Sequence, residues 1–163
     1  MSNKKGFTLV ELMAVAIIVA ILTAVAVPQY RTSVQRAEAT EALINLRNVF
    51  ESAARYKAQN SATPTKADQL DVSFFDSFDS NDGKAYIGNF AYTFAADKIT
   101  ACRVSPSDGL DTYCFKIYYK HDTHGRGALQ CSYAAANKKY AQVCSGFCDK
   151  SNKDSNPCWI DTP

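Results

Sequence analysis

The sequence predicts an α+β fold in which one long N-terminal helix packs on a small antiparallel sheet. Residues 7–60 contain no glycine and only one proline, Pro28. This composition favours a long helix. Residues 90–119 include short segments that alternate along the chain in the way typical of strands. All six cysteines lie beyond residue 101. Their even number and clustering predict a C-terminal region held by disulfide bonds.

The chain from Phe7 to Val27 is almost entirely apolar. As a helix this stretch is about 31 Å long, which is enough to cross a bilayer core of about 30 Å. Lysines precede it, and positively charged flanks favour the cytoplasmic side of a membrane. We therefore expect one transmembrane or assembly helix over residues 7–28, with the rest of the chain outside the cytoplasm.

Glu11 is the one charged residue of this apolar stretch, and a carboxylate in a membrane span usually has a partner. If a peptidase cuts after Gly6, the new α-amino group of Phe7 lies about one helical turn from Glu11. The charge pair could form within a monomer. In a packed array of helices, Glu11 could instead neutralise the amine of a neighbouring copy and set the axial register.

Two other interpretations of this segment stay open. A conventional secretory signal peptide would be cut after the small residues 24–26 and leave a chain that begins at Val27. The apolar region of such a peptide is usually only about 7–15 residues long and would here contain Glu11. A simple anchor helix would carry Glu11 without using it.

The run GFTLVE at positions 6–11 resembles the processing motif of type IV pilins and type II secretion pseudopilins. The resemblance implies that a prepilin peptidase cuts after Gly6, which makes the first six residues a leader, and methylates the new N-terminal Phe7. The family's assembly glutamate corresponds to Glu11, and its helix-bending proline to Pro28. Many relatives carry a glycine in the middle of the apolar segment, which this chain lacks.

The helix is expected to continue through an amphipathic half, residues 29–60, because Pro28 can bend a helix without ending it. Apolar residues recur here at helical spacing and charged residues occupy the other face. A coiled coil is the alternative, but the pattern keeps no long heptad repeat. A globular head over residues 61–163 must therefore cover the apolar stripe. The stripe consists of Val34, Ala37, Leu43, Ile44, Leu46, Phe50, Ala53, Ala54 and Tyr56.

Within the head, residues 90–94, 99–104 and 113–119 are predicted to form a meander of three antiparallel strands. Residues 66–89 are expected to be an irregular connection. Side chains of the third strand point alternately to its two faces. The face expected to cover the helix consists of Tyr113, Phe115, Ile117 and Tyr119.

The cysteines favour disulfide bonds in an oxidising compartment. Sequence alone leaves many pairings open, and we expect each cysteine to pair with its neighbour along the chain. The expected pairs are Cys102–Cys114, Cys131–Cys144 and Cys148–Cys158. The second loop also resembles the disulfide-bounded C-terminal region of many pilins. A zinc site is the alternative, but the chain has no CxxC pair and only two histidines.

Oxygen-bearing side chains before the strands make a weak candidate for calcium, and some pseudopilins that resemble this chain bind calcium. The candidates are Asp76, Asp79, Asn81 and Asp82. Their spacing does not follow the EF-hand pattern, so a solvated acidic turn is the preferred interpretation. We expect no cofactor and no other metal site.

The head offers little sign of catalysis or nucleic-acid binding. His121 and His124 lack an accompanying nucleophile, so we predict that the protein is not an enzyme. Removal of Lys4 and Lys5 with a leader would leave 16 basic and 16 acidic side chains, which gives no basic footprint for DNA. The scattered basic residues that could still touch DNA are Arg103, Arg126, Lys138 and Lys139.

These features predict a structural subunit that sits in the inner membrane before assembly and in an extracellular helical filament of identical copies afterwards. The resemblance implies two kinds of partner: a prepilin peptidase that is also an N-methyltransferase, and inner-membrane pilus or secretion machinery. It permits roles in adhesion, twitching motility, DNA uptake or secretion. A type II secretion pseudopilin or a minor pilin would share the fold, whereas a monomeric membrane-tethered binding protein would not need Glu11.

Overall fold

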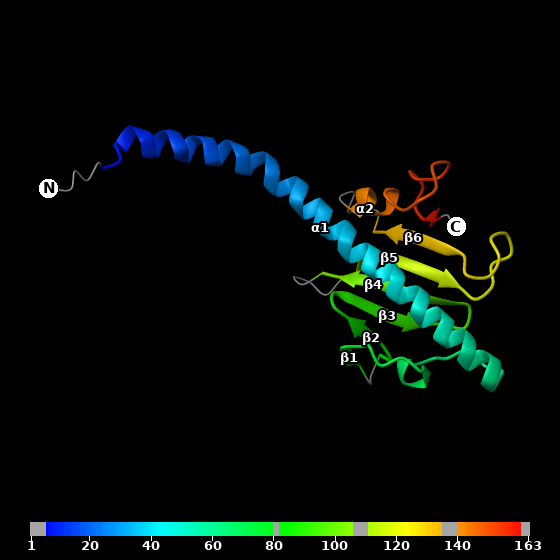
Figure 1. The fold of residues 1–163 in the computed structure, drawn as a ribbon. Helices are drawn as coiled ribbons and strands as arrows, with labels where there is room; N and C mark the ends of the chain where they lie inside the picture. The colour runs from blue at the N-terminus through cyan, green and yellow to red at the C-terminus, as the bar shows by residue number, and fades with distance from the viewer. Residues whose placement is uncertain (1–5, 80–81, 106–110, 135–139, 161–163) are drawn as a thin grey trace. The chain divides into compact units, whose positions relative to one another are not determined.

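One long helix and one antiparallel sheet make up most of the computed structural model, which describes residues 6–79, 82–105, 111–134 and 140–160 (Figure 1). Contacts divide the chain into two units, residues 1–37 and 38–163. The predicted α+β class is confirmed. The predicted divisions after residues 6, 28 and 60 stay predictions.

The secondary-structure elements follow one another without a crossover in the sheet. In chain order they are helix α1 (Leu9–Asn60), the 3-10 helix η1 (Ala67–Gln69), strands β1 (Ser77–Phe78), β2 (Ala85–Ile87), β3 (Phe90–Phe94), β4 (Lys98–Val104), β5 (Asp111–Tyr118) and β6 (Leu129–Tyr133), helix α2 (Ala141–Ser145) and strand β7 (Cys158–Ile160).

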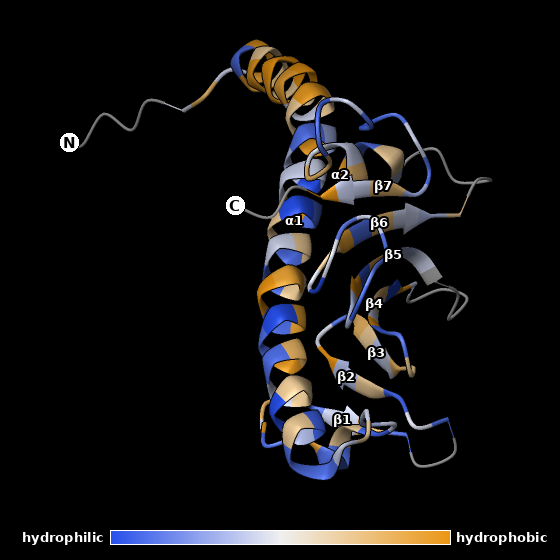
Figure 2. Ribbon diagram, turned by 90° about the vertical axis from the view of Figure 1, so that its right-hand side faces the viewer, coloured by the Kyte–Doolittle hydropathy of each residue, from blue (hydrophilic) through white to orange (hydrophobic). Residues whose placement is uncertain are grey.

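In the first unit α1 is strongly apolar, as the orange colour of this segment shows (Figure 2), and its apolar residues are exposed. The exposed fraction of its large apolar residues runs from 73% at Leu9 to 37% at Val34. Among the described residues, α1 is the one helix long and apolar enough to cross a membrane by length and composition. The helix continues through Pro28, so this proline does not end it. A bend at Pro28 stays a prediction.

In the second unit the later part of α1 packs on one face of the sheet, as predicted. Its buried apolar face consists of Ala39, Ala42, Leu46, Val49, Phe50 and Ala53. The predicted stripe was wrong at three positions. Val34 and Ala37 precede the part of the helix that the sheet covers, and both are exposed. Ile44 is 57% exposed, because it lies about 200° around the helix from buried Leu46.

The sheet is a seven-stranded antiparallel meander in the order β1 to β7. As expected, Phe115 faces the helix, and it lies between Ala101 on β4 and Cys131 on β6. The sheet is larger than predicted, because β1, β2, β6 and β7 were not anticipated. Residues 66–89, expected to be irregular, contain η1, β1 and β2. These strands have two to five residues, too few to show a clear alternation in the sequence.

Candidate functional site

The proposed processing point lies at the open start of the chain's first helix. Gly6 and Phe7 precede the first helical residue, Leu9. Apart from its neighbours in the chain, no described residue has a heavy atom within 4 Å of a Cβ placed on Gly6, and Phe7 is 85% exposed. Nothing in the described part of the chain therefore blocks access of a peptidase to the bond between these two residues.

Glu11 takes part in a reciprocal cap at the start of α1. Its Oε2 accepts a hydrogen bond from the backbone N–H of Thr8 at 2.8 Å and another from the Thr8 hydroxyl at 2.7 Å. The backbone N–H of Glu11 donates to Thr8 Oγ1 at 3.3 Å. This is a capping box, which satisfies backbone donors that a helix start leaves free. Thr8 is thus a site residue that was not singled out from the sequence, although Thr-x-x-Glu before an apolar run is the known signal.

The cap leaves the charge of Glu11 without a cationic partner in the same segment. From Phe7 to Tyr30 the chain contains no lysine, arginine or histidine. In the precursor the Phe7 nitrogen belongs to a peptide bond, so it carries no charge. Among the described residues, Glu11 therefore has no cation within its own apolar segment, and Lys4 and Lys5, which precede that segment, lie outside the described residues.

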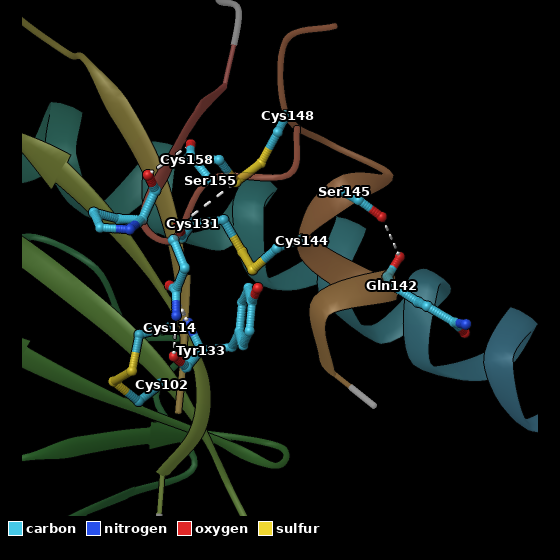
Figure 3. The surroundings of a disulfide bond; sticks show 12 residues. Cys102, Cys114, Cys131, Tyr133, Gln142, Cys144, Ser145, Cys148, Ser155 and Cys158 are labelled. Carbon is cyan, nitrogen blue, oxygen red and sulfur yellow. Dashed lines mark hydrogen bonds between the residues drawn. A yellow bond between two sulfur atoms is a disulfide. The ribbon is translucent and has the colours of Figure 1, made fainter. Parts of the chain in front are cut away.

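The head contains three disulfide bonds, one within the sheet and two that hold the chain around α2 to it (Figure 3). One joins β4 to β5, one joins β6 to α2, and one joins the chain after α2 to β7. The structure forms them between the cysteines expected to pair from their order in the sequence, and no cysteine is left free among the described residues. The pairs are Cys102–Cys114, Cys131–Cys144 and Cys148–Cys158.

The acidic connection uses its carboxylates within its own turns. Asp76 Oδ2 accepts the backbone N–H of Gly88 at 2.6 Å. Asp82 Oδ2 pairs with Lys84 Nζ at 3.1 Å. The backbone N–H of Asp82 donates to Asp79 Oδ1 at 3.4 Å. Asn81, the fourth calcium candidate, lies outside the described residues. In the described ranges no three His, Cys, Asp or Glu side chains are grouped so that they could hold a metal ion.

The two histidines belong to an aromatic cluster with Trp159. The His124 ring stacks on the Trp159 ring with centroids 3.9 Å apart, and the His121 ring meets Trp159 edge-on at 4.5 Å. The hydroxyl oxygen of Thr123 lies 2.7 Å from His124 Nδ1 and 3.2 Å from His121 Nδ1. These contacts give both rings a structural role in packing the loop against β7.

The basic residues considered for DNA do not gather in one place. Arg103 pairs through Nε with Glu38 Oε2 at 3.1 Å, and the pair is largely buried. Arg126 lies over the Phe50 ring, 5.5 Å from its centroid. Lys138 and Lys139, the two other candidates, lie outside the described residues. The described pair therefore gives no continuous basic surface.

A polar cluster fastens the connection after α1 to the helix. Asp71 accepts hydrogen bonds from Arg55 Nε and Nη2, both at 2.8 Å. It also accepts the hydroxyl of Ser52. The Arg55 guanidinium and then the Ser52 hydroxyl favour the ionised carboxylate, which lowers the pKa of Asp71 to about 2. The cluster orients the chain as it leaves the helix toward β1.

Comparison with known proteins places the proposed processing site in a recognised motif. Residues 1–27 match the family model described as the prokaryotic N-terminal methylation motif. Two fimbrial proteins of Pseudomonas aeruginosa are each 42% identical over 82 residues, covering 47% of this chain and 53% of theirs. A fimbrial protein of Moraxella nonliquefaciens is 50% identical over 42 residues, covering 26% of this chain and 27% of its own.

The chain thus spans about half the length of the curated Pseudomonas relatives it matches. The methylation motif and the fimbrial relatives together confirm the predicted resemblance to type IV pilins. This family is structural rather than enzymatic.

Proposed function

We propose that this chain is the precursor of a structural subunit of a type IV pilus filament. The observation that carries the proposal is the uncovered apolar helix of the first unit, which begins within a methylation motif and holds a single carboxylate. An apolar surface this large needs cover from lipid or from protein. Packing against the same helix of other copies would provide that cover in a filament without lipid.

Processing prepares the chain for this packing. A prepilin peptidase removes residues 1–6, and its N-methyltransferase activity modifies the new amino group of Phe7. The exposure of Gly6 and Phe7 ahead of the helix supports this step. Removal of the leader also removes the two lysines that precede the apolar segment, and these charges would oppose withdrawal of the helix from the bilayer.

Glu11 then determines the axial position at which a helix packs into the array. The Phe7 amine is the one new cation that processing creates, and the nearest lysine, arginine or histidine in the mature chain is Arg31. In a low-dielectric array of apolar helices, an unpaired Glu11 carboxylate is costly. Pairing with the amine of a neighbouring copy would remove this cost and define the axial stagger. The Thr8 cap supports this role because it holds the carboxylate at the helix start.

The same architecture defines location and partners. Before assembly the apolar helix anchors the subunit in the inner membrane, with the disulfide-bonded head outside the cytoplasm. Afterwards the head coats the filament at the cell surface. The partners are further copies, the prepilin peptidase, and the inner-membrane assembly machinery. Adhesion, twitching motility or DNA uptake would be properties of the polymer.

A type II secretion pseudopilin or a minor, tip-located pilin would use the same helix and processing site. Abundance separates these alternatives, because a major subunit makes up most of the protein in sheared surface fibres and the others do not. A monomeric tethered protein would appear in membranes and never in fibres.

The test compares fibre assembly of Glu11→Ala with that of Glu51→Ala, which removes an exposed carboxylate from the later part of the same helix. We expect Glu11→Ala to lower the ratio of fibre-borne to membrane-borne protein by about tenfold or more, because the buried amine then lacks its counterion. Glu51→Ala should assemble like the wild type. Quantitative immunoblots of sheared and membrane fractions measure the ratio. Wild-type assembly by Glu11→Ala would contradict the proposed role of Glu11.

A further inference from the structure

Two cavities of opposite charge lie beside α1 in the second unit. The first, here called the acidic pocket, has a volume of about 210 Å³ and includes Glu38, Glu41, Asn45 and Asn89 in its wall. No described lysine or arginine lines it. It is formed between α1 and the turn that joins β2 to β3.

The second cavity, here called the basic pocket, has a volume of about 300 Å³. It is lined by Lys57, Arg126 and Tyr119, together with two alanines of α1. No described acidic residue lines it. It is formed between α1 and the chain that joins β5 to β6, so the two pockets use opposite halves of the sheet.

Three of the four charged side chains that line the two pockets take no part in an ion pair between described residues. Glu38 is paired with Arg103, but Glu41 is exposed and has no ion pair with any described residue. Lys57 and Arg126 face aromatic rings, at 5.5 Å from the centroids of Tyr119 and Phe50 respectively, and neither pairs with a described carboxylate.

Tyr119 forms part of the wall of the basic pocket. Its hydroxyl is buried and has no partner among the described residues, so it does not face an incoming side chain. Lys57 and Arg126 therefore provide the polar recognition in this pocket, and two cations suit an incoming carboxylate better than a neutral group.

The helix sets the directions in which the pockets open. Asn45 of the acidic pocket and Ala54 of the basic pocket are nine positions apart in the sequence. At about 100° per residue this separation places them about 180° apart around the axis, and about 14 Å apart along it. Buried Leu46 lies about 100° around the axis from Asn45 and about 80° from Ala54, so the buried face of α1 lies between the two pockets. The acidic and basic pockets therefore flank the helix on opposite sides.

We propose that the acidic pocket of one copy receives the Lys57 and Arg126 side of the next copy, as a head-to-head contact that repeats along the filament. The proposal rests on the proposed filament function. The contact is heterologous, because it joins two different surfaces of identical chains, and such contacts propagate into open helical assemblies. Charge complementarity selects the partner surface and the register of the contact. Glu11 would set the stagger of the helices. Glu41 would determine which side of each head contacts the next copy.

A charge swap in the full-length chain tests the proposal. Glu41→Lys should assemble poorly, since position 41 then faces Lys57 and Arg126, and a Lys57→Glu/Arg126→Glu variant should assemble poorly because it faces Glu41. Each should lose about tenfold in fibre-borne protein at low salt, and less at high salt. Co-expression of the two variants should restore fibres, because every contact in an alternating filament is again complementary. The triple variant should also assemble alone.

The controls separate this inference from the filament proposal. Normal removal of the leader and normal disulfide bonds on non-reducing gels show that a variant has been exported and has folded. If wild-type chains form no fibres, the filament function fails. If wild-type chains form fibres and the charge variants assemble equally well at low salt, this contact alone is wrong. If the basic pocket instead binds an unrelated anion, co-expression of the two variants will not restore fibres. That result would also overturn the proposed contact.

Cross-linking gives a readout that does not depend on assembly efficiency. Fibres that carry Glu41→Cys and Arg126→Cys should yield a ladder of linked subunits with a short bis-maleimide. Fibres that carry Glu51→Cys and Arg126→Cys should not, because position 51 lies on the side of α1 away from the sheet. Intact fibres with no ladder from the first pair would overturn the proposal.

Discussion

The two parts of α1 have the same backbone structure and opposite relations to solvent. In the first unit Leu12 is 61% exposed, whereas in the second unit Leu46 is fully buried against the sheet. Both are leucines in one continuous helix. The difference shows that the head satisfies its part of the helix within the chain, while the N-terminal part has no such cover and depends on lipid or on other copies.

The difference also separates folding from assembly. The stability of the head comes from apolar burial and disulfide bonds, at roughly 25 cal/mol for each Å² of apolar surface removed from water. The apolar surface of the N-terminal part stays exposed in the monomer, so it contributes no such free energy to folding. Substitutions in the two parts should therefore affect different measurements.

The largest expected effect comes from the same substitution made in each part. Leu46→Ala should lower the free energy of unfolding of the head by about 2–5 kcal/mol, because it leaves a cavity between helix and sheet. Leu12→Ala should change it by no more than about 0.5 kcal/mol. Urea unfolding of the full chain in detergent, followed by fluorescence of its single tryptophan, Trp159, measures both. Equal losses would show that the two parts of α1 are stabilised alike.

A second effect concerns the link between β6 and α2. Replacement of both Cys131 and Cys144 by alanine should lower the free energy of unfolding by about 3 kcal/mol, since this disulfide closes a short loop in a thin, single-sheet head. The same variant should keep the helical structure of residues 9–27 in detergent, measured by amide hydrogen exchange. An unchanged urea midpoint would contradict a structural role for this bond.

The smallest effect is pH-dependent and belongs to Asp71. Its pKa in the folded chain, about 2, lies below the ordinary value of 3.8, so ionisation favours the folded state above the ordinary value. That contribution is lost as the pH falls through the folded pKa. The stability difference between wild type and Asp71→Asn should therefore shrink from about pH 5 to about pH 2. The amount is modest because Arg55 and Asp71 are both exposed.

The matched control for this prediction is Asp68→Asn, which removes a neighbouring exposed carboxylate of η1. Because Asp68 has no ion pair with any described residue, Asp68→Asn should change the urea midpoint at about pH 5 less than Asp71→Asn does. A gap between wild type and Asp71→Asn that widens toward low pH would contradict the assigned direction of the Asp71 pKa.

The helix and the central strands could be predicted because their signals extend over many residues. The helix was expected to run to residue 60 and ends at Asn60, and the predicted strand over residues 90–94 is β3. The alternation that places Phe115 on the helix side is likewise visible in the sequence. Strands β1, β2 and β7 could not be predicted, because each has only two or three residues. These strands are defined by their hydrogen-bonded pairing with an adjacent strand.

The candidate site was predicted less completely than the fold. The positions of Gly6, Phe7 and Glu11 followed from the motif. The hydrogen bonds between Thr8 and Glu11 were not predicted, although the two residues have the spacing of a capping box. Ile44 was assigned to the buried stripe because it is apolar, although its angle around the helix points away from the sheet. The two charged pockets are formed by residues far apart in the sequence, such as Lys57 and Arg126. No local sequence pattern therefore predicts them.

If the uncovered helix is processed and incorporated into a polymer, the mass of the polymerised subunit will show it. The most direct measurement is the intact mass of the subunit recovered from sheared surface fibres, before and after reduction. We expect a chain that begins at Phe7, carries one additional methyl group, and gains six hydrogens when its three disulfide bonds are reduced. A chain that begins at Val27, or one that retains residues 1–6, would contradict it.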